Sequence, residues 1–328
     1  MKLRSVWTEN GIAVEALKSG ASNDWVRLAN IEKLAEISER FSVKNNLQIS
    51  MLSILELGHE GWKVLSEQVD TCVSTAEPEA ILMLPFQPLS FRDFLLFEQH
   101  FIDATRGFVK RFLPKKYRMS KIYEALTGKV FPRFKPSPLW YRQPLYYLGN
   151  HLNFITSGDD IITPSYTRAL DYELELGAIL AKPLFNATAS DAENAIGGYV
   201  VLNDLSARDV QMAEMRSGFG PQKAKHFMNV MSPIVITADE INERINDLQG
   251  AVIIDGVKRA HCTTASMQYS LAEAIAYASK DEQLYSGELF GSGTLPGGSG
   301  MENDHWLYPG SVLNLKIDDV GEMTNRVV

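Results

Sequence analysis

The chain has 328 residues, enough for one large domain or for one large and one small domain. Its net charge of −8 argues against a nucleic-acid-binding protein, which would carry a basic surface. No segment reaches the roughly 20 apolar residues of a membrane span, and the first residues lack the apolar core of a signal peptide. Cys72 and Cys262 show no metal or redox spacing, so we expect a reduced, cytoplasmic protein. The charge and the lack of long apolar segments lead us to expect no nucleic-acid or membrane partners.

The first 85 residues combine short strand-like runs at 11–17 and 25–29 with a helical pattern over 31–41. Pro85 and Pro88 then follow an apolar run and interrupt regular structure. We therefore expect a small β-containing N-terminal domain over residues 1–88 and a larger domain over residues 89–328.

Beyond residue 88, apolar or alternating segments recur and are separated by glycine-rich turns. They lie at 145–156, 174–181, 196–206, 232–238, 250–256 and 311–317, and helical patterns lie at 92–112, 189–196 and 270–279. Strands outnumber helices and do not alternate regularly with them. The pattern predicts a β-rich α+β fold.

The segment "LDYELEL" over 170–176 places Asp171, Glu173 and Glu175 at every second position. On a strand these carboxylates share one face, whereas on a helix the grouping would be lost. Apolar residues follow Glu175 on both faces, so the strand is expected to enter the interior. Carboxylates at the edge of a core repel one another unless a cation or a proton lies between them. The alternative is a solvated strand face.

A carboxylate cluster without cysteine or histidine favours a hard divalent cation such as Mg²⁺, Ca²⁺ or Mn²⁺ over zinc. Two ligands do not make a tight site, so others should come from elsewhere in the chain. Asp204, at the end of the apolar run 197–202, is one candidate, with a turn or a helix cap as the alternative interpretation.

Three segments together resemble the fumarylacetoacetate hydrolase (fumarylacetoacetase) family. "LDYELELGAILAKP" over 170–183 is similar to its E-x-E metal strand, and "GYVVLNDLSARDVQ" over 198–211 is similar to its N-D-x-S-A-R-D-x-Q signature. "GSGTLPGGSGMENDHWLYPGSVL" over 291–313 resembles its C-terminal G-T loop and the turn that follows. The resemblance spans roughly 90–328 and implies a mixed β-roll/β-sandwich catalytic domain that forms a homodimer.

The resemblance also implies the residues of a site. The metal ligands would be Asp93, Glu173, Glu175 and Asp204. They would hold one divalent cation, for which Mg²⁺ is the expected ion and Ca²⁺ and Mn²⁺ are the alternatives. The catalytic groups would be His100, Glu302 and Lys225, and the substrate contacts would be Tyr147, Arg208, Gln211 and Thr294.

Asp93 and His100 match the D-F-x-x-x-x-x-H element of the family's C–C bond hydrolases. The implied substrate is a β-diketo acid such as an acylpyruvate or fumarylacetoacetate, the latter belonging to aromatic amino acid catabolism. His100, oriented by Glu302, would take a proton from water, and Lys225 would stabilise the leaving enolate. Two alternatives stay open: a decarboxylase or isomerase acting on an oxaloacetate-like acid, and a catalytically silent metal-binding relative.

Some positions depart from the family pattern. Asn229 replaces a usual threonine, Met228 replaces a small residue, and the sequence after Glu302 differs from the usual E-L-G. We interpret Arg216 and Lys223 as solvated loop residues. His226, His261 and His305 show no ligand spacing and are assigned structural roles, while the role of His151, beside Tyr147, stays open.

Overall fold

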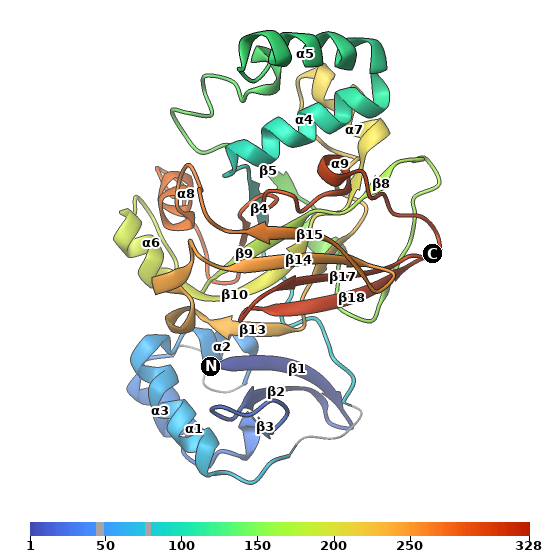
Figure 1. Cartoon of the computed structure of the whole chain (residues 1–328). Coiled ribbons are helices and arrows are strands. Elements are labelled where there is room, and N and C mark those ends of the chain that lie inside the picture. Colours follow the sequence, from blue (N-terminus) through green and yellow to red (C-terminus); the bar gives the residue numbers. More distant parts are fainter. Residues whose placement is uncertain (44–48, 76–79) are drawn as a thin grey trace.

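The computed structural model describes residues 1–43, 49–75 and 80–328 (Figure 1). Its largest element is an 11-stranded sheet in the order β3-β2-β1-β13-β10-β9-β16-β4-β5, with β12 and β6 attached beside β10. In chain order these strands are β1 (Lys2–Thr8), β2 (Gly11–Leu17), β3 (Trp25–Arg27), β4 (Phe91–Phe94), β5 (Tyr146–Gly149), β6 (Phe154–Ile155), β9 (Leu174–Leu180), β10 (Ile196–Asn203), β12 (Asn229–Met231), β13 (Ile234–Thr237) and β16 (Leu289–Gly291).

A second sheet of five strands has the order β15-β14-β17-β18-β7. Its strands are β7 (Asp160–Ile161), β14 (Gln249–Ile254), β15 (Val257–Thr263), β17 (Val312–Ile317) and β18 (Gly321–Val327). Strands β17 and β18 pack against β10 of the large sheet. The two short strands β8 (Leu170–Asp171) and β11 (Ser206–Ala207) form a separate pair.

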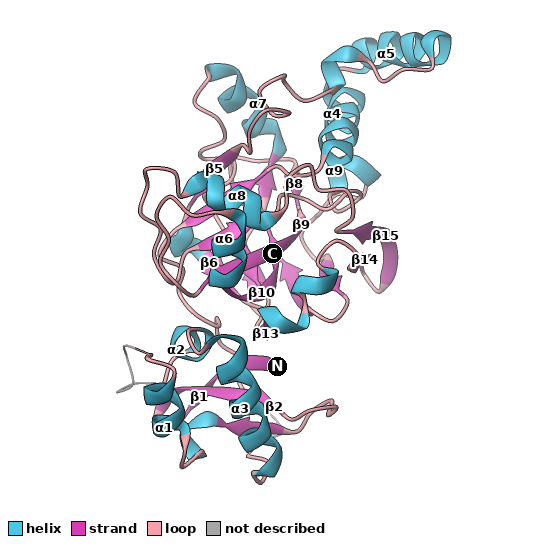
Figure 2. Cartoon of the chain, turned by 90° about the vertical axis from the view of Figure 1, so that its left-hand side faces the viewer, coloured by secondary structure: helices cyan, strands magenta, loops and turns pink. Residues whose placement is uncertain are grey.

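Helices cover the sheets and the end that carries β4 and β5. They are α1 (Leu34–Arg40), α2 (Met51–Leu55), α3 (Gly58–Thr71), α4 (Glu98–Phe112), α5 (Pro114–Thr127), α6 (Ala189–Ala195), α7 (Arg208–Ser217), α8 (Leu271–Ala278) and α9 (Gly300–Asn303). Short 3₁₀ turns lie at Leu28–Asn30, Pro132–Phe134, His151–Asn153, Ala238–Glu240 and Asn242–Arg244. Figures 1 and 2 both place α4, α7 and α9 at the end of the molecule opposite the N-terminal segment.

The centre of the large sheet is the antiparallel pair β9 and β10, and every residue of both strands is buried. Their sequences, LELGAIL and IGGYVVLN, are almost wholly apolar, as expected for strands covered on both faces. A Cβ at Gly177 would lie 2.7 Å from Leu202 Cδ1 and 2.9 Å from Val200 Cγ2, so a larger residue there would displace side chains of β10. The β-rich α+β fold predicted from the sequence is confirmed, and strands outnumber helices among the described residues.

The N-terminal segment continues the large sheet through antiparallel pairing of β1 with β13. The amino group of Met1 donates to Thr237 and to Glu240, and buried Arg4 pairs with buried Glu15 at 2.7 Å. In Figure 2 the helices α1 and α3 lie over strands β1 and β2 at this end. The division of the chain at residue 88 stays a prediction. Within the described ranges, no helix is long and apolar enough to cross a bilayer.

Candidate active site

Three buried carboxylates meet at one end of the large sheet. Asp93 lies on β4, Glu175 on β9, and Asp204 directly after β10. One oxygen of each lies within 4.8 Å of the other two. Strand β16 runs between β4 and β9, and its Gly291 pairs with Asp93. A Cβ at position 291 would lie 2.4 Å from Asp93 Oδ1 and 2.8 Å from Glu175 Oε2, so glycine leaves the space in which the carboxylates converge.

The chemistry of this acidic triad (Asp93, Glu175 and Asp204) fits a divalent cation. Asp93 Oδ1 and Glu175 Oε2 are buried and accept no hydrogen bond. Burial raises the pKa of both carboxyls well above the ordinary range, and the neighbouring carboxylates raise it further. Buried carboxylates without partners are costly, and an oxygen-only donor set of this charge suits Mg²⁺, Ca²⁺ or Mn²⁺ alike. The triad can therefore hold a divalent metal ion.

Glu173, the fourth predicted ligand, lies next to the acidic triad but outside the group of three. Its Oε1 accepts a 2.6 Å hydrogen bond from Arg208 Nη2, and its Oε2 accepts one from Lys225 Nζ. Burial would raise the pKa of Glu173, but these two cations hold it well below its ordinary value. Metal ligation by Glu173 stays a prediction, since in this structure it is neutralised by protein cations.

Arg208, the first residue of α7, is held by buried partners. Its Nε donates to Asp171 Oδ2 at 2.8 Å and its Nη1 to Gln211 Oε1 at 3.0 Å. Asp171 in turn accepts hydrogen bonds from the backbone N–H groups of Gly300 (2.8 Å) and Met301 (3.1 Å) at the start of α9. Asp171, the first carboxylate of the segment 170–176, therefore links Arg208 to α9. The sequence predicted one strand for Asp171, Glu173 and Glu175, and this is wrong: Asp171 ends β8, which pairs with β11, and Glu173 precedes β9. The role of Asp171 was not predicted.

His100 lies on α4 with its ring buried against two glutamates. Its Nδ1 is 3.0 Å from Glu302 Oε2, and its Nε2 is 3.8 Å from Glu173 Oε1. Burial alone would lower the pKa of His100, but the charges of Glu302 and Glu173 outweigh it and raise that pKa above the ordinary value. The structure thus brings together His100 and Glu302, which are 202 positions apart in the sequence.

Glu302 is held in a fixed orientation by the first turn of α9. Its Oε1 accepts from the N–H of Gly297 at 3.0 Å, and its Oε2 accepts from the N–H and the hydroxyl of Ser299 at 3.1 and 2.8 Å. Ser299 is the N-cap of this helix, and the reciprocal bonds form a capping box. The sequence S-x-x-E at 299–302 therefore builds the local structure that orients the glutamate toward His100.

The remaining predicted residues surround the acidic triad. Lys225 Nζ lies between Glu173 and Asp204 and donates to both, and these charges outweigh the effect of burial and raise the Lys225 pKa. The Tyr147 hydroxyl donates to Asp204 Oδ2 at 2.7 Å, and Thr294 Oγ1 lies 3.5 Å from Glu175 Oε1. Every residue that the resemblance implied as catalytic, substrate-binding or metal-ligating is therefore found in one region, and their individual roles stay predictions.

Two further side chains, Asn229 and His226, contact residues of the site, and Asn229 is one of the departures from the family pattern. The amide of Asn229, with its nitrogen turned toward these acceptors, donates to Asp204 Oδ1 and to the Met228 carbonyl at 3.0 Å. The His226 ring stacks on Tyr147 with centroids 6.4 Å apart, and its Nε2 lies 2.9 Å from the Leu148 carbonyl. Both side chains support residues of the site.

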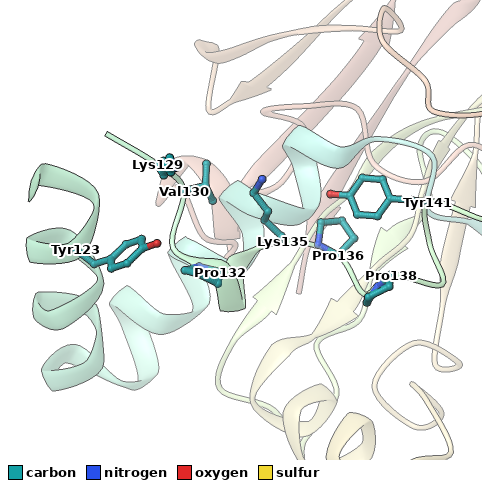
Figure 3. Close-up of a pocket in the computed structure, with 8 residues that line it drawn as sticks. All are labelled: Tyr123, Lys129, Val130, Pro132, Lys135, Pro136, Pro138 and Tyr141. Carbon is teal, nitrogen blue, oxygen red and sulfur yellow. The ribbon is translucent and has the colours of Figure 1, made fainter. Parts of the chain in front are cut away.

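The site opens into a cavity of about 1250 Å³. Asp93, Glu173, Glu175, His100, Arg208, Gln211, Lys225, Tyr147 and Thr294 all line it. A smaller pocket of about 620 Å³ lies between α5 and the segment 129–141 (Figure 3). Tyrosine, lysine, proline and valine side chains line this pocket, and its lining contains none of the carboxylates described above. The larger cavity is therefore the candidate active site.

The sequence analysis missed the apolar walls of this cavity. Phe101 and Phe108 on α4 and Met212 and Met215 on α7 line it, and helical spacing from His100 and Arg208 is the signal that could have identified them. The interpretation of Arg216 as a loop residue is wrong, because α7 continues to Ser217 and Gly218 ends it in the left-handed conformation. Arg216 is exposed, as expected, but it lines the cavity.

The sequence model of the C-terminal domain of fumarylacetoacetate (FAA) hydrolase matches residues 120–328. The chain belongs to the fumarylacetoacetate hydrolase family. Asp93 and His100 precede the matched range, so their assignment to the site rests on the geometry described above.

Among curated relatives, the mitochondrial oxaloacetate tautomerase FAHD1 of Homo sapiens is 32% identical over 166 residues, covering 49% of this chain and 74% of the relative. A 2,4-didehydro-3-deoxy-L-rhamnonate hydrolase of Sphingomonas sp. (strain SKA58) is 26% identical over 187 residues, covering 56% of this chain and 65% of the relative. The oxaloacetate tautomerase YisK of Bacillus subtilis is 28% identical over 53% of this chain, and that match spans only 58% of the relative's own length.

The fold itself extends over the whole chain. The structure of a fumarylacetoacetate hydrolase from psychrophilic Exiguobacterium antarcticum superimposes with a TM-score of 0.69 at 19% identity, covering 100% of this chain and 99% of the other. This likeness establishes the fumarylacetoacetase-type architecture for both the N-terminal segment and the rest of the chain. The family and fold expected from the sequence are thus confirmed.

Divalent cations should stabilise the protein through the acidic triad. With Mg²⁺ or Mn²⁺ at about 100-fold its Kd, the free energy of unfolding should rise by about 2.7 kcal/mol, measured as an increase in Tm. Glu175→Gln removes a ligand at constant side-chain size and should abolish the increase in Tm. Glu322→Gln, at an exposed position of β18, should retain the increase. An equal cation effect in all three proteins would contradict binding at the triad.

Loss of the Asp171 charge should destabilise the fold. Asp171→Asn leaves buried Arg208 with one compensating carboxylate fewer, so we expect a loss of roughly 3 kcal/mol in the free energy of unfolding, measured with urea. Asp318→Asn removes an exposed carboxylate 2.9 Å from Lys316 and should change stability by less than about 1 kcal/mol. Equal effects of the two substitutions would contradict the role assigned to Asp171.

Gly107 on α4 should be required for the His100–Glu302 contact. A Cβ there would lie 1.7 Å from the carbonyl oxygen of Met301, so Gly107→Ala must move α4 away from α9. We expect turnover to fall about 10- to 100-fold through misplacement of His100, while metal binding measured by calorimetry is unchanged. Gln99→Ala, exposed on the same helix, serves as the control. Full activity of Gly107→Ala would show that the contact is not needed.

Proposed function

We propose that the protein is a divalent-metal-dependent hydrolase that cleaves a C–C bond of a β-diketo acid, such as an acylpyruvate or fumarylacetoacetate. The observation that carries this proposal is the buried His100–Glu302 pair in the same cavity as the acidic triad. Hydrolysis requires a base that activates water, and a histidine oriented by a carboxylate is a recurring solution. The diketo acid substrate and the homodimer implied by the family belong to this proposal.

The cation would be held by Asp93, Glu175 and Asp204, with Glu173 as the further ligand implied by the family. When bound, it supplies Lewis-acid polarisation of the oxygens of a 1,3-dicarbonyl group. Tyr147 and Thr294 hydroxyls lie at the edge of the triad, where they can orient the substrate oxygens. The apolar strands β9 and β10 behind the triad exclude water from that side.

His100 would act as the general base. With its Nδ1 3.0 Å from Glu302 Oε2, His100 would use its Nε2 to take a proton from water. The resulting hydroxide adds to the carbonyl carbon of the acyl group, and the bond between that carbon and the neighbouring carbon breaks. The electron pair of this bond remains on the leaving enolate, which takes up a proton. An acylpyruvate would thus give a carboxylic acid and a 2-oxo acid, and fumarylacetoacetate would give a dicarboxylic acid and a 3-oxo acid.

Lys225 would stabilise the negative charge that develops on the enolate oxygen. Its ammonium group lies between Glu173 and Asp204 and lines the cavity, so a positive charge is fixed in place before the reaction begins. Arg208 donates hydrogen bonds to Glu173 and Gln211 and thereby holds both side chains in place. Arg208 already donates to three protein groups, so its proposed contact with substrate is secondary to this positioning role.

An oxaloacetate tautomerase is the second candidate, because two of the relatives described above carry that name. Keto–enol exchange also uses a cation and a fixed ammonium group to stabilise an enolate, but it breaks no C–C bond. The two reactions therefore differ in their products and in whether water must be activated.

Cleavage should depend on His100. The protein with Mg²⁺ or Mn²⁺ is incubated with acetylpyruvate, fumarylacetoacetate and oxaloacetate, and enol absorbance and products are followed together. We expect cleavage to two acids, falling by about 10²- to 10⁴-fold in His100→Ala because the general base is lost. His261→Ala, exposed on β15, is the control. Interconversion of oxaloacetate tautomers without carbon–carbon cleavage, unaffected by His100→Ala, would identify a tautomerase instead.

A further inference from the structure

The active-site cavity continues outward between two helices. Helix α4 lines it with His100, Phe101, Ala104, Thr105 and Phe108, and helix α7 lines it with Arg208, Gln211, Met212, Met215 and Arg216. In each helix these positions follow the 3.6-residue repeat, so they form one continuous face. Eight residues of helix correspond to about 12 Å, which is the length of wall between the catalytic groups and the outer end.

The polarity of these walls changes along their length. At the inner end lie the ionic groups His100 and Arg208, both buried. Farther out, the residues facing the cavity are mainly apolar: Phe101, Ala104 and Phe108 on α4, and Met212 and Met215 on α7. The distal part of the cavity therefore differs in chemistry from the metal site that it adjoins.

The outer end exposes large apolar side chains. Met215 is 54% exposed, and Phe219, in the glycine-flanked segment after α7, is 85% exposed, although both line the cavity. Ligand cavities are typically lined by such side chains, which lose contact with water when the ligand binds. Because this surface is continuous with the catalytic centre, its occupant is the part of the substrate that lies beyond the reacting carbonyl.

We propose that this cavity selects substrates with an extended apolar acyl arm, a straight alkyl or aryl group of roughly eight carbons, in keeping with the ~12 Å wall. The inference rests on the proposed function, since it identifies the acyl group of the diketo acid. A short acetyl group would not reach Phe108 and Met215. A second carboxylate beside Phe101 and Met212 would lose hydration and find only the uncharged Thr105 and Gln211 in the middle of these two helix faces, which disfavours diacids whose charge lies in mid-cavity.

Arg216 provides the contrasting possibility that the test must address. It is exposed at the outer end, and within the described ranges no ion pair to it is seen. A substrate with a carboxylate at the far end of a long arm would reach this guanidinium, whereas a purely apolar arm would not use it. We infer an apolar arm because apolar side chains make up most of the wall between the two ends.

The test is a chain-length series of 2,4-dioxo acids from acetyl- to decanoylpyruvate, with Mg²⁺ present. We expect kcat/KM to rise two- to fourfold for each added methylene, up to about eight acyl carbons, since each buried methylene contributes about fourfold in affinity. Phe108→Ala and Met212→Ala should each reduce the octanoyl-to-acetyl ratio about tenfold, with little effect on acetylpyruvate. Ile122→Ala, exposed on α5 outside the cavity, is the control.

A binding measurement separates this inference from the proposed reaction. Saturated 2-oxo acids of four to ten carbons carry the same arm but cannot be cleaved, and their affinities for the Mg²⁺-loaded protein are measured by calorimetry. Affinity that rises with length and falls in Phe108→Ala supports the apolar arm even if no dioxo acid is cleaved, an outcome that would overturn the hydrolase alone. Cleavage of acetylpyruvate without any length dependence overturns the arm alone. A preference for chains ending in a carboxylate, lost in Arg216→Ala, overturns it in favour of a diacid.

Discussion

The site depends on an unequal balance of buried charge. Five carboxylates are buried within it, from Asp93, Asp171, Glu173, Glu175 and Asp204, whereas the fixed cations among them are Arg208 and Lys225. Arg208 pairs with Asp171 and Glu173, and Lys225 pairs with Glu173 and Asp204. Among the described residues neither Asp93 nor Glu175 forms an ion pair, and Asp93 Oδ1 and Glu175 Oε2 accept no hydrogen bond. The fold thus concentrates negative charge where a cation can offset it.

Two structural systems hold the residues proposed to react. The acidic triad is carried by β4, by β9 and by the residue directly after β10, and β16 pairs with both β4 and β9. His100 and Glu302 are carried by helices α4 and α9, which meet at Gly107. Rigid elements on both sides are suited to a reaction that tolerates little misplacement. Asp171 joins the two systems, since it accepts from Arg208 and from the first turn of α9.

Local patterns in the sequence accounted for much of this arrangement. Alternation placed Glu173 and Glu175 on one strand face, and the apolar run before Asp204 indicated a buried strand end. The hydrogen-bond partners of Asp171 could not be predicted, because Arg208 and Gly300 lie 37 and 129 positions away in the sequence. Similarly, pairing of β1 with β13 joins residues more than 200 positions apart, so no local pattern shows that the N-terminal strands extend the main sheet. The contact between His100 and Glu302 could be predicted only from the resemblance to the family.

The separation of strand-borne and helix-borne groups has an evolutionary consequence. Substitutions in α4 or α9 can alter the proposed activation of water without changing the strands that carry Asp93 and Glu175. Lineages with the same ion-binding sheet could therefore diverge in the reaction they catalyse through changes in a single helical contact. The presence of both tautomerases and a hydrolase among the relatives of this chain agrees with such a history. Gly107, where the two helices touch, is one position at which a single larger side chain would change that contact.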